Sequence, residues 1–149
     1  MPTAHFAHKR SPTRHVESLI MLPWDLEDWL TEEGDKAVRI VAAQSRDALD
    51  ADTRLLYEFW LFDTEQRNGG VSQYFCNNGL AHWDVLLRLA SPALPSFTAF
   101  AAKVDEVVGR SDDPYQSVIH SAIDLDAWYS QHQTRLVTEL RAAVGPATK

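Results

Sequence analysis

Apolar residues recur every three to four positions over most of the chain, which predicts amphipathic helices. The clearest pattern follows the spacing i, i+3, i+4, i+7, i+10 and i+11 and consists of Phe97, Phe100, Ala101, Val104, Val107 and Val108. Such a stripe lets one face of a helix pack against a core. No segment of alternating polarity predicts a strand. We therefore expect an all-α fold, an irregular bundle of six or seven helices in a single domain.

Helix-capping and helix-breaking residues set the expected boundaries of the first helices. A short helix is predicted from Pro23 to near Gly34, because proline suits a first helical turn and glycine a helix end. Asp35 is then predicted to cap a second helix that reaches about Leu49.

The third predicted helix is the centre of the fold. It starts at Asp50 or Asp52, ends near Arg67, and its apolar side chains cover most of the circumference: Leu55, Leu56, Phe59, Trp60 and Phe62. A helix that is apolar nearly all round is buried among others. The sequence Asn68-Gly69-Gly70 should end it, because asparagine and glycine tolerate left-handed backbone.

Shorter helical segments are expected in the second half of the chain. They cover residues 71–76, 80–90, 95–108 and 115–120, with breaks at 77–79, 91–95 and 109–114. Asp124 is predicted to cap the last helix, which Gly145 and Pro146 end.

Residues 1–18 differ in composition from residues 19–149, the predicted single domain. This N-terminal arm contains Lys9, Arg10 and Arg14 but only one acidic residue, Glu17, so we expect a flexible segment. Its histidines, His5, His8 and His15, lack a cysteine pair and do not predict a metal site. No cofactor is expected.

The charge of the chain argues against direct contact with nucleic acid. The net charge is −7, and from Val16 onward the formal charge is about −10. Six carboxylates lie in one short stretch: Asp25, Glu27, Asp28, Glu32, Glu33 and Asp35. This stretch lacks the clustered Lys and Arg residues that bind the phosphates of nucleic acid. Its negative charge is instead compatible with a basic protein partner. One cysteine and no secretory or membrane-spanning segment predict a cytoplasmic protein.

Candidate catalytic residues are sparse. Cys76 follows two aromatic residues and is interpreted as a small buried side chain rather than a nucleophile. Glu58, Asp63 and Glu65 form no Glu-x-x-His pattern, so a di-iron site is not predicted. We therefore expect no enzymatic activity.

Polar residues after the double glycine allow two interpretations. Gln73 and Asn77 are four positions apart and share a helix face, and Tyr74 adds a hydroxyl. Their first interpretation is structural, with the amides bonded to backbone groups exposed at Gly69-Gly70. The second is a pocket for a small molecule or an undetected enzymatic site.

The same stretch resembles the hallmark of a known protein family. The pattern Glu65-x-x-Asn68-Gly69-Gly70-x-x-Gln73-Tyr74-Phe75-x-Asn77 is similar to that of a bacterial family of domains of unknown function, typified by the DNA-mimic protein numbered nineteen. The resemblance extends over roughly residues 49–140, where Leu125-Asp126-x-x-Tyr129 is similar to the family's closing helix.

That resemblance implies an all-α protein without established enzymatic activity. For the DNA-mimic member it implies a dimer whose acidic surface occupies the DNA-binding face of a transcription factor. If mimicry applies here, the six carboxylates between residues 25 and 35 are the predicted protein-binding residues. An immunity or accessory protein is a further alternative.

Overall fold

The computed structural model describes residues 22–109 and 111–145, and the described residues form helices without strands. These are α1 (Trp24–Ala43), the 3-10 turn η1 (Arg46–Ala48), α2 (Ala51–Ala90), α3 (Pro95–Val108), α4 (Pro114–Val118) and α5 (Ala122–Val144). The all-α class is confirmed. With five α-helices in the described ranges, the predicted number of six or seven is slightly too high. The predicted arm, 1–18, lies outside these ranges.

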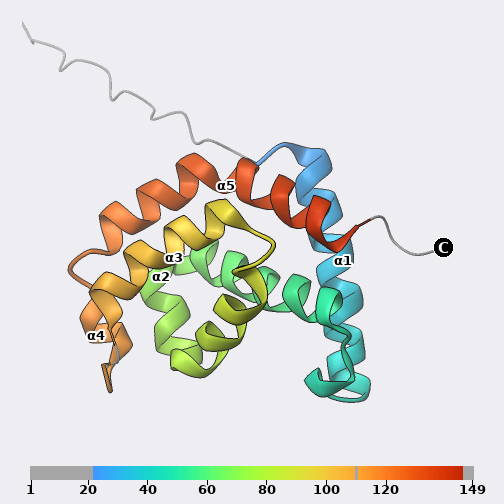
Figure 1. The fold of residues 1–149 in the computed structure, drawn as a ribbon, viewed down its shortest axis with the longest axis horizontal. Coiled ribbons are helices and arrows are strands. Elements are labelled where there is room, and N and C mark those ends of the chain that lie inside the picture. Colours follow the sequence, from blue (N-terminus) through green and yellow to red (C-terminus); the bar gives the residue numbers. More distant parts are fainter. Residues whose placement is uncertain (1–21, 110, 146–149) are drawn as a thin grey trace, which may run out of the picture.

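Helix α2 runs through the middle of the molecule and then turns back, with α1 crossing near its beginning and α3 and α5 along one side (Figure 1). The side chain of Asp50 caps it by accepting a hydrogen bond from the Thr53 N–H at 2.8 Å, which confirms one predicted start. Its 40 residues are interrupted at Gly70 and Gly79, where the backbone leaves the helical conformation. Both predicted breaks are therefore present, inside one kinked element.

The core is built around the ring of Phe62, which is fully buried. Five aromatic rings have their centroids between 4.8 and 5.8 Å from it, namely Tyr74, Trp83, Phe97, Phe100 and Tyr129. Such pairs add about 0.5–1.5 kcal/mol each beyond the apolar area they bury. The predicted burial of the first part of α2 is confirmed.

The predicted helix end at Gly34 and the cap at Asp35 are wrong. Helix α1 continues through both residues to Ala43. Gly34 is buried, and a Cβ at this position would collide with the indole of Trp60 in α2. Glycine costs a helix interior about 1 kcal/mol relative to alanine. The close approach of Trp60 explains why a residue without a side chain is needed here.

Boundaries in the second half of the chain are mostly as predicted. Helix α3 begins at Pro95 and ends before Gly109, whose φ is 54°, and α5 ends before Gly145, whose φ is 71°. The predicted cap at Asp124 is wrong: α5 begins at Ala122, and Asp124 lies in its first turn, where a carboxylate still favours the helix dipole.

Candidate functional site

Asp126 of α5 closes the interruption of α2 at Gly70. Gly70 has φ 80° and ψ −178°, a conformation that is essentially confined to glycine. The next N–H, that of Val71, donates to Asp126 Oδ1 at 2.9 Å, and Gln66 Nε2 donates to the same oxygen at 2.9 Å. A Cβ on Gly70 would collide with this carboxylate. The Asn-Gly-Gly sequence therefore provides the space in which a carboxylate from another helix replaces the lost helical hydrogen bond.

The amides of the motif have a different role from the predicted one. Gln73 and Asn77 do share a face, but they donate to Glu65 Oε2, at 2.7 and 2.9 Å, instead of to the broken backbone. The prediction that these amides satisfy the backbone at Gly69-Gly70 is wrong, because Asp126 takes that role. Through these two hydrogen bonds, the Glu65 carboxylate connects the part of α2 before Gly70 with the part after it.

The aromatic residues of the motif belong to the core. Phe75 and Tyr74 are buried, and the Tyr74 ring meets those of Phe62 and Trp83. Within residues 22–109 and 111–145, the Tyr74 hydroxyl has no hydrogen-bond partner. Its pKa is raised, first by burial and then by the nearby Glu58 carboxylate. The interpretation of Cys76 as a buried side chain is wrong, since it is exposed.

A second carboxylate, Asp63, connects α2 with α5. It is 1% exposed and accepts hydrogen bonds from the Tyr129 hydroxyl at 2.7 Å, from Gln133 Nε2 at 2.8 Å and from Arg67 Nε at 2.9 Å. Burial, followed by the Asp63 carboxylate, raises the pKa of Tyr129. Arg67 also donates to Glu27 Oε1 at 2.8 Å, which attaches α1 to the same network.

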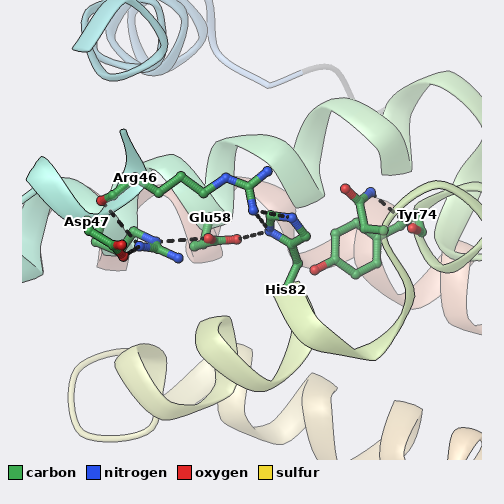
Figure 2. A network of polar contacts seen from close by, with 7 residues as sticks. Arg46, Asp47, Glu58, Tyr74 and His82 are labelled. Carbon is green, nitrogen blue, oxygen red and sulfur yellow. Dashed lines mark hydrogen bonds and ion pairs between the residues drawn. The ribbon is translucent and has the colours of Figure 1, made fainter. Parts of the chain in front are cut away.

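A third carboxylate, Glu58, is the centre of the network in Figure 2 and is fully buried. It accepts from Arg54 Nε at 2.9 Å and contacts His82 Nδ1 at 2.9 Å. The Arg46 guanidinium contacts the other ring nitrogen of His82, so we assign the proton of a neutral imidazole to Nδ1. Figure 2 also shows the Tyr74 hydroxyl directed toward His82.

Sequence reasoning missed this network. Arg54 precedes Glu58 by four positions, a spacing that predicts an ion pair, and Glu58 lies within an apolar run. His82 carries no comparable signal, because its contact with Glu58 depends on the turns of α2 at Gly70 and Gly79. The described residues contain no group of three His, Cys, Asp or Glu that could hold a metal ion.

A hollow of about 410 Å³ lies beside the interruption at Gly70. The motif contributes Asn68, Gly69 and Gly70 to its lining; the other lining residues are Leu22, Glu27, Gln66, Arg67, Asp126, Ser130 and Gln133. Gln73, Tyr74 and Asn77, the predicted pocket residues, do not line this hollow.

The predicted acidic binding residues all lie on α1. Four of them are exposed and follow the spacing i, i+3, i+7 and i+10, which places them on one face; we call Asp25, Asp28, Glu32 and Asp35 the acidic row. Glu27 and Glu33 lie outside this row and form ion pairs within the protein. Glu27 pairs with Arg67, and Glu33 pairs with Lys36 at 2.8 Å. Lys36 also lies 3.4 Å from Glu32.

None of the helices in the described ranges combines the length and apolar character that a membrane span requires.

Comparison with protein families gives one match. Neither a comparison with curated proteins nor one with solved structures gave a match. The model of the DMP19-like protein family matches residues 47–135, which include the interruption of α2 and the three carboxylates Glu58, Asp63 and Asp126. The chain therefore belongs to the DMP19-like protein family.

Proposed function

We propose that this chain is a non-enzymatic protein-binding domain whose acidic row occupies the DNA-binding surface of a basic regulator. The observation that carries the proposal is the exposure of four carboxylates on one face of α1. Asp25, Asp28 and Asp35 have no ion-pair partner among the described residues, so their charges are available to a partner. Membership of the DMP19-like family supports the same role, because the family resemblance implies DNA mimicry.

The spacing of the acidic row suits one strand of a DNA duplex. A helix rises about 1.5 Å per residue, so the row spans roughly 15 Å from Asp25 to Asp35. One strand places a phosphate about every 3.4 Å along the axis, or about four over that length. A basic surface shaped for a short run of phosphates would therefore meet a similar density of negative charge on α1.

Trp24 gives this face an apolar anchor. Its side chain is 76% exposed and lies four positions before Asp28, on the same side of α1. Tryptophan is enriched among residues that dominate binding energy, and its ring face attracts guanidinium groups. A partner rich in arginine could use both the ring and the carboxylates.

A charge-reversal variant tests the proposal. The acidic row lies outside residues 47–135, so it can be changed without altering the family motif. We expect Asp25→Lys, Asp28→Lys and Asp35→Lys together to abolish salt-sensitive capture of DNA-binding proteins from a cell extract. The captured protein should also be displaced from its DNA by the unchanged chain in a mobility-shift assay.

The matched control reverses three exposed carboxylates elsewhere: Glu106, Asp112 and Asp124. Both variants change the net charge equally, so a general charge effect would weaken capture in both. Capture that survives reversal on α1, or that does not respond to salt, contradicts the proposal.

A further inference from the structure

Several polar side chains that line the hollow beside Gly70 already make hydrogen bonds within the protein. Gln66 donates one N–H to Asp126, and Gln133 and Arg67 each donate an N–H to Asp63. Its volume of about 410 Å³ is within the range of small-ligand sites. A ligand site here also requires acceptors with unused capacity.

Two acceptors in the lining have unused capacity. Gln66 is 7% exposed, and its Oε1 is buried without a hydrogen-bond partner in the part of the chain that the structure describes. Asp126 uses Oδ1 for both of its donors, while Oδ2 accepts no hydrogen bond from the described residues. A buried acceptor without a partner is costly. A ligand that donates a hydrogen bond to Gln66 Oε1 would remove that cost.

The charge of the lining favours a cation. Glu27, Arg67 and Asp126 are its charged residues. The Arg67 guanidinium is already bound by the carboxylates of Asp63 and Glu27, at 2.9 and 2.8 Å. Asp126 faces no positive side chain among the described residues, because its partners are an amide and a backbone N–H.

We propose that this hollow binds a guanidinium or ammonium group, with Asp126 Oδ2 and Gln66 Oε1 as its acceptors. Such a group carries several donors and a positive charge, which match both unused acceptors and the uncompensated carboxylate. The group can belong to a free small molecule or to an arginine or lysine side chain of a protein. The site does not require the acidic row, which lies on the outward face of α1.

Titration of the ¹⁵N-labelled full chain tests the site. One probe is agmatine, a free guanidinium compound, and the other is the blocked peptide acetyl-Gly-Arg-Gly-amide. Binding should shift the amide resonances of Gly69, Gly70, Val71 and Asp126 in a saturable way. Agmatine alone, or the peptide alone, would identify the source of the cation. The peptide with citrulline in place of arginine has the same shape without the charge and should not bind.

Two variants separate binding from folding. Asp126→Asn keeps a carbonyl acceptor for Val71 and Gln66 but replaces Oδ2 by an amide donor, so affinity for the bound probe should fall at least tenfold. Ser130→Arg, at an exposed lining position of α5, places the chain's own guanidinium in the hollow and should prevent binding. Its matched control is Thr138→Arg, exposed on the same helix, which should bind normally.

The proposal is overturned if neither arginine-type probe binds, if citrulline binds as well as arginine, or if Ser130→Arg binds like Thr138→Arg. Melting followed by circular dichroism confirms that each variant is folded. Reversal of the acidic row should leave probe binding intact, so failure of the hollow and failure of the proposed function are distinguishable.

Discussion

Two buried tyrosines of the aromatic core differ in the hydrogen bonding of their hydroxyl groups. Tyr129 and Tyr74 are 1% and 0% exposed, and both rings pack against Phe62. The Tyr129 hydroxyl donates to the Asp63 carboxylate, whereas the Tyr74 hydroxyl has no hydrogen-bond partner among the residues that the structure describes. One hydroxyl therefore contributes to stability, and the other carries a desolvation cost.

Replacement of each tyrosine by phenylalanine measures this difference. Tyr129→Phe removes a hydrogen bond to a charged acceptor and should lower the free energy of unfolding by about 1.5–3 kcal/mol. Tyr74→Phe removes an unsatisfied group, so stability should stay the same or rise by about 1 kcal/mol. Urea denaturation checks both values. An equal loss in the two variants would mean that the Tyr74 hydroxyl does have a partner in solution.

At the scale of elements, the interruptions of α2 differ in what surrounds them. Gly70 and Gly79 both have positive φ, at 80° and 61°. A Cβ on Gly70 meets the Asp126 carboxylate, whereas a Cβ on Gly79 has no atom of the described residues within 4 Å. Only the first interruption is therefore held by tertiary packing as well as by backbone conformation.

Alanine substitutions separate those two contributions. Gly79→Ala should cost about 1–3 kcal/mol from backbone strain alone. Gly70→Ala should cost more, because the added methyl group also displaces Asp126 from Val71. Thermal unfolding of the two variants gives the comparison. Equal losses would show that the contact with Asp126 contributes nothing.

Gly34 in α1 lies directly against the Trp60 indole of α2. Gly34→Ala raises the intrinsic helix propensity by about 1 kcal/mol but forces the methyl group into the Trp60 indole. We expect a net loss of stability, and we expect Trp60→Phe to relieve part of it. A double-mutant cycle measures that coupling. Additive effects would place the cause of any loss outside the Gly34–Trp60 contact.

Sequence-based prediction succeeded where the deciding residues were neighbours in the chain. The Asp50 cap, the breaks at residues 70 and 79 and the burial around Phe62 all follow from local patterns. It failed where the deciding residue was distant. The glycine at position 34 is matched to Trp60, and the carboxylate that closes the predicted break at Gly70 is that of Asp126; neither partner can be identified from spacing. The Glu58–His82 contact was missed for the same reason.

At the scale of the whole molecule, buried phenols limit the alkaline range of stability. Burial raises the pKa values of Tyr74 and Tyr129 in the folded chain, while an unfolded tyrosine ionises near pH 10. The folded state therefore keeps protons that the unfolded state loses. The stability from these groups is present below about pH 10 and is lost as the pH rises above it.

Absorbance at 295 nm, which reports ionised tyrosine, checks this effect. We expect part of the tyrosine signal of the unchanged chain to appear only at the pH where circular dichroism reports unfolding. That late part should become smaller in Tyr74→Phe and in Tyr129→Phe. Complete ionisation of the folded chain before unfolding would contradict the expected pKa shifts.

Helix α1 buries Leu26, Leu30, Gly34 and Ala37 against the rest of the molecule. Its outward positions 25, 28, 32 and 35 take no part in that packing. The chemistry of this surface can therefore be redesigned separately from the stability of the scaffold. A combinatorial library at those four positions could select α1 faces for new partners, with the helices from residue 51 onward kept unchanged as a constant support.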